Sequence, residues 1–179
     1  MADVLLDNIK KGCEGGQAFT GNAEWQLFRG YSSLDEGIIK NEWLYFRIYI
    51  VDLATFLAFG DTPKRQLVLD PFVCNVTNWL KNRPAPSILE ARICLFPDPA
   101  NPLIFPPENA EPAVKRLNRR IKTYAEATKL ENEQANMRAQ VFAALCGVSH
   151  DVASIVSINA YLSTLKVETA KVMKKFLTA

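Results

Sequence analysis

Histidine is nearly missing from this sequence: His150 is the only one in 179 residues. One histidine excludes the sites that need two, such as the paired Glu-x-x-His motifs of di-iron helical bundles. The four cysteines are scattered and include no CxxC pair, whereas tetrahedral zinc sites need clustered cysteine or histidine. No glycine occurs from Asp61 to Cys146, so the middle of the chain holds no glycine-rich phosphate loop. We therefore predict a protein with no metal and no cofactor.

A strong charge of either sign is also lacking, because 21 Lys and Arg residues face 19 Asp and Glu residues, a net charge of +2. This balance is too mild to indicate a nucleic-acid or membrane partner by itself. The most hydrophobic stretch, residues 43–59, is shorter than the roughly 20 residues of a spanning helix and contains Arg47 and Asp52. The N-terminus has neither a basic region nor a long apolar stretch. We therefore expect no secretory signal, a cytoplasmic protein and no membrane partner.

Signals for β-strands are scarce, since the chain has no sustained apolar–polar alternation and no Asn-Gly or Asp-Gly turn. An apolar fraction of 49% and the helical spacing of the apolar residues predict an all-α fold. We expect a single-domain irregular helical bundle over residues 1–179, with a long C-terminal helical hairpin.

The ten prolines all lie between Pro63 and Pro112, and six of them fall in residues 97–112. This composition is typical of an extended, polyproline-like segment. The alternatives are an internal division of the chain at 97–112 and a strap across one domain. We favour the strap, because apolar residues at its centre can pin it to the bundle, namely Leu103, Ile104 and Phe105.

Helix-start and helix-stop residues divide the chain further. Capping-box patterns begin at Ser33 and Ser87, each with a glutamate three residues later. Gly60 and Gly147 are typical helix stops, and Pro71 lies inside a helical pattern, where we expect a break or a kink. The predicted helices are 3–11, 22–29, 34–59, 63–82, 87–96, 113–146 and 149–176.

The densest group of charges lies near the start of the predicted helix 113–146. Five of the eight residues from 115 to 122 are basic, and helical spacing places them opposite the apolar side of the helix. Such a ridge can neutralise the phosphates of RNA, each contact releasing a counterion. The alternative is a solvated face with acidic neighbours. The candidate nucleic-acid-binding residues are Lys115, Arg116, Arg119, Arg120 and Lys122.

A polar stripe interrupts the apolar helix 34–59. Steps of three, four and three residues place Glu42, Tyr45, Tyr49 and Asp52 on one helix face. A carboxylate and phenols among apolar residues need partners. One interpretation is a ligand-binding pocket lined by these four residues. The other is a buried hydrogen-bond network that uses Arg47 of the same helix or Arg92 elsewhere in the chain.

Cys146 is followed by Ser149, His150 and Asp151, which are residue types of nucleophilic catalysis. Catalytic triads assemble from residues that are distant in sequence, and His150 with Asp151 is more typical of a helix cap. We therefore predict no catalytic residue and no enzymatic activity.

Three functional hypotheses follow. The leading one is a non-enzymatic helical protein that acts through self-association and protein contacts, as a homo-oligomer or with a protein partner. Residues 122–136 have few large apolar side chains and are expected near a subunit contact. The second is an RNA-binding, nucleocapsid-like protein that uses the basic helix at 115–122. The third is a small-molecule-binding protein with a pocket at the Glu42 stripe.

Overall fold

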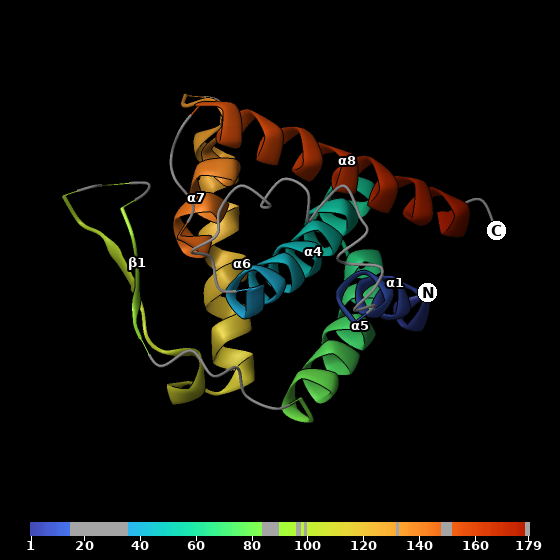
Figure 1. The fold of residues 1–179 in the computed structure, drawn as a ribbon. Helices are drawn as coiled ribbons and strands as arrows, with labels where there is room; N and C mark the ends of the chain where they lie inside the picture. Colours follow the sequence, from blue (N-terminus) through green and yellow to red (C-terminus); the bar gives the residue numbers. More distant parts are fainter. Residues whose placement is uncertain are drawn as a thin grey trace.

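The computed structural model describes residues 1–14, 36–83, 90–95, 98, 100–131, 133–147 and 152–177. Over these residues the protein is a bundle of helices with one small two-stranded sheet (Figure 1). The all-α prediction is therefore confirmed. The helix expected at 22–29 and the cap at Ser33 lie outside the described residues. The helices are α1 (Ala2–Glu14), α4 (Glu36–Phe59), α5 (Pro63–Lys81), α6 (Ala113–Leu130), α7 (Met137–Cys146) and α8 (Val152–Leu177).

Helix α4 runs through the middle of the bundle and separates two hydrophobic cores (Figure 1). On one side, Trp43 and Phe46 pack with residues of α6, α7 and α8. On the other side, Leu44 and Ile48 pack with residues of α1 and α5. A helix that is covered on both sides has to be apolar nearly all round, which is the pattern that the sequence shows there.

Helix α5 continues through Pro71 without a break, so the expected break is wrong. Proline cannot donate a hydrogen bond to the carbonyl of Leu67 in the preceding turn. Leu67 is 76% exposed, so water can take the place of that bond. Phe72 and Val76 are buried on the opposite side of the helix and fix it against the bundle.

Residues 90–95, the described part of the predicted helix 87–96, are not helical, and the cap at Ser87 lies outside the described residues. Arg92–Cys94 is strand β1, and it pairs in antiparallel fashion with strand β2, Leu103–Phe105. Each strand has one exposed and one buried residue in sequence, as a half-buried strand requires. The proline-rich segment is thus pinned to the bundle through its buried Phe105, as expected, but as a strand that leads into a short 3-10 turn, η1 (Glu108–Ala110).

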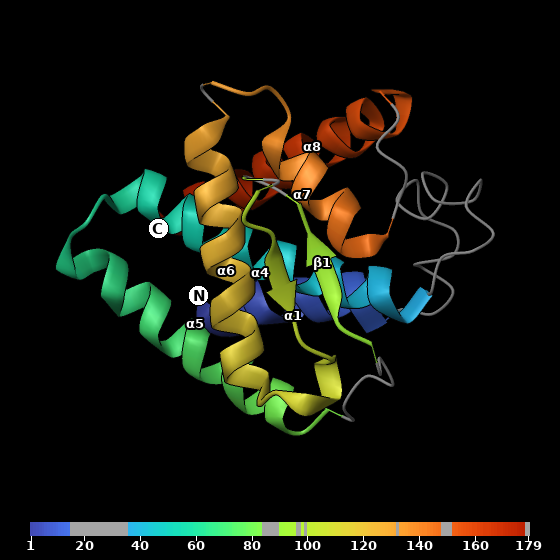
Figure 2. The same ribbon diagram turned by 90° about the vertical axis from the view of Figure 1, so that its left-hand side faces the viewer.

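The single helix predicted over 113–146 is wrong, because α6 ends at Leu130 and α7 begins at Met137. In Figure 2 the chain turns at the top of α6 and α7 comes back beside it. Asn136 at the turn has a positive φ of 64°, which no helix residue can have. The Glu131 carboxylate accepts hydrogen bonds from the backbone N–H and the side chain of Arg138, so it caps the start of α7.

The turn predicts a contrast between two asparagine substitutions. Asn136→Ala should lower the free energy of unfolding by about 1 kcal/mol, because alanine tolerates a left-handed backbone less well than asparagine. Asn136→Gly should have little effect or stabilise the fold. Asn118→Ala, on an exposed position within α6, is the control and should be nearly neutral. Urea unfolding measures all three, and equal losses for the two alanine variants would contradict the assignment.

Candidate functional site: a buried arginine–glutamate cluster

The Glu42 side chain of α4 is fully buried and points toward α6. Arg120 of α6 approaches it with two nitrogens: Nε lies 2.9 Å from Oε1 and Nη2 lies 2.6 Å from the same oxygen. Arg92 of β1 adds a third contact, with Nη1 2.8 Å from Oε1. The Glu42 charge is therefore shared between two guanidinium groups that come from distant parts of the chain.

Glu108 of the η1 turn is a second buried carboxylate in the same cluster. Its Oε1 lies 2.5 Å from Nη2 of Arg92 and 3.0 Å from Nη2 of Arg120, so both arginines bridge the two carboxylates. Its Oε2 lies 3.1 Å from Nε of Arg116 and accepts a 2.9 Å hydrogen bond from the hydroxyl of Tyr45. Four segments, α4, β1, η1 and α6, thus meet through charged side chains.

Arg120 remains charged within the cluster. Burial alone would lower the pKa of Arg120, but its ion pairs with Glu42 and Glu108 raise the pKa above the usual value for arginine. The Arg120 guanidinium also lies 4.1 Å from the ring centroid of Phe105, which covers one of its faces. These contacts hold the group in one orientation.

The tyrosine hydroxyl groups in and beside the cluster are uncharged and take part in hydrogen bonds. Burial raises the pKa of the Tyr45 phenol well above its usual value, and the Glu108 carboxylate adds to the shift. Burial likewise raises the pKa of Tyr124, whose hydroxyl lies 3.4 Å from Glu42 Oε2, and the pKa of Tyr49, whose hydroxyl bonds to Thr128. Phenols in this state are poor proton donors for acid–base catalysis near neutral pH.

The predicted Glu42 stripe is divided by the structure. Glu42 and Tyr45 join the arginine cluster directly, and the partner named as an alternative, Arg92, is present in it. Asp52 lies apart and forms an ion pair with Arg65 of α5, at 2.7 Å. The buried-network interpretation therefore describes this stripe. The stripe lines neither the hollow of about 260 Å³ nor the groove of about 520 Å³ that described residues form elsewhere.

The predicted basic ridge is divided as well. Arg116 and Arg120 point into the protein, with side chains 12% and 3% exposed, and pair with buried carboxylates. Arg119 is partly exposed, and its guanidinium bonds to Glu111 at 2.8 Å and to the carbonyl of Ile104 at 2.9 Å. Lys115 and Lys122 are the exposed members, at 70% and 78%. Of the five residues of the ridge, two lysines and one partly covered arginine therefore face solvent.

The sequence gives no indication of Glu108 as a member of the cluster, and it indicates Arg92 only as one of two possible partners. Glu108 lies in the proline-rich segment, where a single acidic residue gives no signal of burial. Arg92 lies in a segment that was predicted to be helical. The contact of Arg92 with Glu108 joins residues 16 positions apart, and that of Arg120 with Glu42 joins residues 78 positions apart. Local periodicity carries no information over such separations.

Cys146 lies at the end of α7, buried beside the cluster. Burial, together with the nearby Glu42 charge, raises the pKa of the Cys146 thiol well above its usual value. The thiolate is the reactive form of cysteine, so this environment suppresses nucleophilic chemistry. Residues 149–151, considered with it in the sequence analysis, lie outside the described residues.

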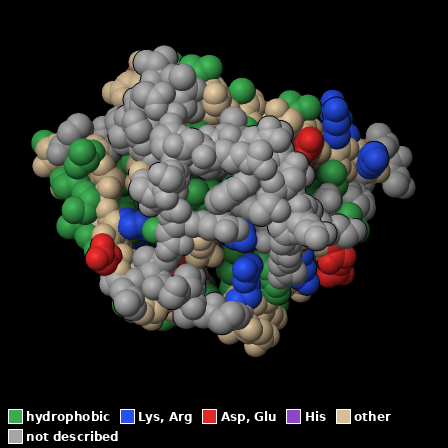
Figure 3. All heavy atoms as spheres, in the orientation of Figure 1, with side chains coloured by type: hydrophobic (Ala, Val, Ile, Leu, Met, Phe, Trp, Pro, Cys, Tyr) green, Lys and Arg blue, Asp and Glu red, His purple; other side chains and the backbone are tan. Residues whose placement is uncertain are grey.

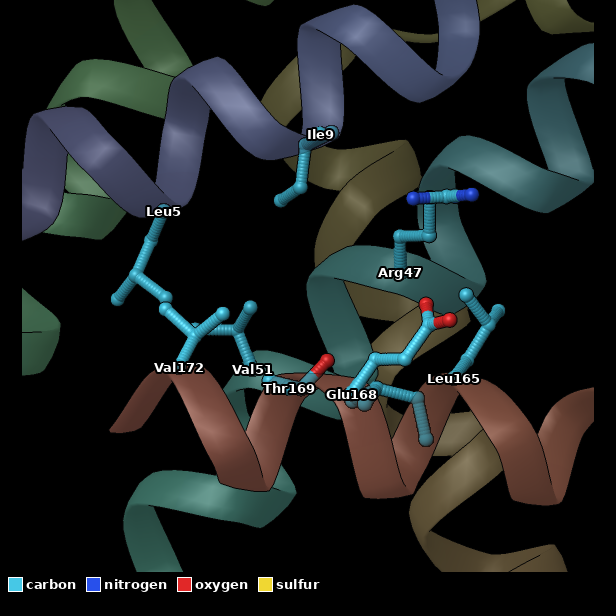
Figure 4. Close-up of a pocket in the computed structure, with 9 residues that line it drawn as sticks. Leu5, Ile9, Arg47, Val51, Leu165, Glu168, Thr169 and Val172 are labelled. Carbon is cyan, nitrogen blue, oxygen red and sulfur yellow. The ribbon is translucent and has the colours of Figure 1, made fainter. Parts of the chain in front are cut away.

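A hollow of about 260 Å³ lies between α1, α4 and α8 (Figure 4). Its walls are mostly apolar, and the side chains of Arg47, Glu168 and Thr169 supply the polar part. In Figure 4 the Glu168 carboxylate points toward the side where Arg47 lies. Arg47 also contacts the hydroxyl of Tyr161 at 3.4 Å.

Comparison with protein-family models, with curated proteins and with solved structures finds no match to this chain. Within the described ranges, no three or more His, Cys, Asp or Glu side chains are grouped so that they could hold a metal ion. The helices in those ranges also include none with the length and apolar character needed to cross a membrane.

The cluster predicts unequal effects for two carboxylate-to-amide changes on α4. Glu42→Gln should lower the free energy of unfolding by about 3 kcal/mol or more, because it leaves buried guanidinium charges uncompensated. Asp52→Asn, which removes a partly exposed ion pair, is the control and should cost no more than about 1 kcal/mol. Denaturant titration compares them, and a small loss for Glu42→Gln would contradict the described network.

The cysteines predict an order of chemical modification. Cys74 is exposed and should be alkylated by iodoacetamide in the native protein. Cys94 and Cys146 are buried and should react only after unfolding. In the native protein the raised pKa of Cys146 also keeps its thiol protonated, which is the unreactive form. Peptide mapping by mass spectrometry before and after addition of denaturant gives the order. Native labelling of Cys146 as fast as that of Cys74 would contradict it.

Proposed function

We propose that this protein acts by associating with a second copy of itself, through the β1–β2 hairpin, and not as an enzyme. The observation that carries this proposal is an uncharged apolar face on the hairpin that no described part of the chain covers. Ile93 and Ile104 lie directly opposite each other on the two strands and are 58% and 61% exposed, and Leu95, next to β1, is 52% exposed. Contiguous apolar surface of this kind is typical of contact sites.

The hairpin stands at one side of the molecule, where it is accessible. Figure 1 shows it projecting beyond α6 and α7 on the left, and Figure 3 shows hydrophobic side chains gathered at that edge. The inner face of the same hairpin is occupied by Cys94 and Phe105, which are 0% and 2% exposed. An outer face that only met water would be expected to carry polar residues instead.

The two edges of the hairpin differ in their hydrogen bonds to other described residues. The carbonyl of Ile104 accepts a hydrogen bond from Arg119 of α6, so the peptide groups of Ile104 face α6 and away from β1. In an antiparallel pair, the peptide groups of the opposite residue, Ile93, then face away from β2. They form no hydrogen bond with other described residues. β1 can therefore accept a further strand at this edge.

A second copy is the occupant that fits this surface. Arg92 is the one charged residue in the two strands, and its guanidinium is turned inward to Glu42 and Glu108. A charged partner would gain no complementary charge from the strands, whereas the same hairpin of another molecule offers an uncharged apolar face and an open edge. Pairing of β1 with β1 about a two-fold axis would give a four-stranded antiparallel sheet with the isoleucines on one face.

The size of the face sets the strength of the association. Three side chains offer much less than the roughly 800 Å² per partner of a stable interface. We therefore expect a weak, concentration-dependent dimer, with strand pairing adding directional hydrogen bonds. Residues 122–136, where the sequence analysis expected the contact, include the exposed Lys122 and Lys129 and the charged turn after α6, and they are less apolar than the hairpin.

Sedimentation velocity over a range up to about 500 µM tests the proposal. The wild-type protein should show a sedimentation coefficient that rises with concentration, and Ile93→Glu and Ile104→Glu should each remain monomeric. Leu67→Glu on α5 and Val167→Glu on α8 are matched controls, since these residues are 76% and 53% exposed outside the hairpin, and they should associate like the wild type. A wild-type monomer throughout, or equal effects of all four changes, would refute the proposal.

A further inference from the structure

The end of α5 and the start of α6 face each other across an open groove of about 520 Å³. The residues that line it include the basic side chains Lys81, Arg83 and Arg116, and one acidic side chain, Glu111. None of these residues lies in the hairpin, so the groove is independent of the proposed self-association.

Arg83 has a donor without an acceptor. Its Nη1 is buried and makes no hydrogen bond within the described chain. The guanidinium lies 4.7 Å from the ring centroid of Trp79, and it forms no ion pair with a described carboxylate. A buried charged N–H group without an acceptor is costly in free energy, and native structures rarely leave one unsatisfied. The Arg83 charge is therefore not neutralised by any described carboxylate, and the part of the guanidinium that lines the groove is left to a ligand.

Arg116 has one nitrogen left for a ligand. Its Nε contacts Tyr45 and Glu108, and its Nη1 donates to the backbone carbonyls of Glu108 and Glu111. Nη2 has no partner in the described structure. Four contacts hold the guanidinium rigidly, so the free N–H groups are oriented before a ligand arrives.

The start of α6 adds a third source of positive potential. Pro112, the residue before the helix, provides no side-chain cap, so the N–H groups of the first turn from Ala113 are not capped by it. The amino end of a helix of this length favours an anion. Lys81, exposed at the other wall, forms no ion pair with any described carboxylate. The Glu111 charge is already compensated by Arg119 at 2.8 Å and Lys115 at 3.7 Å.

We propose that this groove binds the phosphate group of a small phosphorylated ligand, held by Arg83, Arg116 and Lys81. Lys81 and Arg83 come from the end of α5 and Arg116 comes from the start of α6, so donors lie on two sides of the groove. This arrangement suits the three or more oxygens of a tetrahedral phosphate better than the two oxygens of a planar carboxylate. The groove also has room for the part of a ligand beyond its phosphate.

Binding can be measured by calorimetry and by thermal shift, with inorganic phosphate and glycerol phosphate as probes and chloride at equal ionic strength as the blank. Both probes should bind saturably and raise the melting temperature, whereas chloride should not. Lys81→Gln/Arg83→Gln should weaken binding by about tenfold or more, because it removes two charged donors. Lys122→Gln/Lys129→Gln removes the same charge from exposed positions on α6 outside the groove and should bind as the wild type does.

Amide NMR on the wild-type protein provides a readout that needs no variant. Phosphate should shift the signals of Ala113 and Val114 before those of α8. Equal weakening by the two double variants would show general charge attraction and overturn the proposal, as would the absence of saturable binding. Binding of a short RNA without binding of either small phosphate probe would also overturn it, in favour of a nucleic-acid backbone.

Discussion

The bundle depends on one buried negative charge. Glu42 has no access to water, and the interior can hold its carboxylate only because Arg92 and Arg120 contact it directly. Those arginines belong to β1 and α6, so the Glu42 charge is compensated only where α4, β1 and α6 meet. A buried ion cluster of this type adds little net stability compared with an apolar packing of the same shape. Its effect is that other arrangements of these four segments would leave a charge unpaired.

The cluster also explains why a sheet of only two short strands persists in a helical protein. A hairpin of two strands is marginal in water by itself. Here Arg92 ties β1 to two carboxylates and, through a 2.8 Å hydrogen bond, to the carbonyl of Leu145 at the end of α7. On the other strand, Phe105 is buried, and Arg119 holds the carbonyl of Ile104. The hairpin is thus an extension of the core.

The sequence predicts those helix boundaries that depend on nearby residues, namely on capping residues and on the spacing of apolar side chains. The ends of α4 at Gly60 and of α7 at Gly147, the start of α5 at Pro63 and the extent of α8 follow from caps and from helical periodicity. A strand of three residues is too short to show a period of two, so β1 was taken for a helix. The turn before α7 has Asn136, and not a glycine, at its left-handed position. A glycine there would have indicated a helix end, and without it the sequence predicts one helix in place of α6 and α7.

The candidate site was predicted in part for the same reason. Spacing alone placed Glu42, Tyr45 and Tyr49 on one helix face, and the polar character of that face indicated partners. Helical spacing could not indicate that Arg116 and Arg120, two of the five clustered basic residues, point into the protein. It does not reveal which basic side chains form ion pairs with buried carboxylates. Glu108 gave no local signal, since its role depends on contacts with residues far from it in the chain.

The immobility of Arg92 has a consequence for its neighbour in the chain. Ile93 follows directly a residue whose guanidinium is fixed by Glu42, Glu108 and Leu145, so the backbone of β1 has little freedom to lose when another strand joins it. A short strand that is not held by other contacts loses conformational entropy when it pairs with another strand, and this loss weakens binding. In this protein the ion pairs of Arg92 hold β1 in one conformation, which would lower the entropy cost of the strand pairing proposed above.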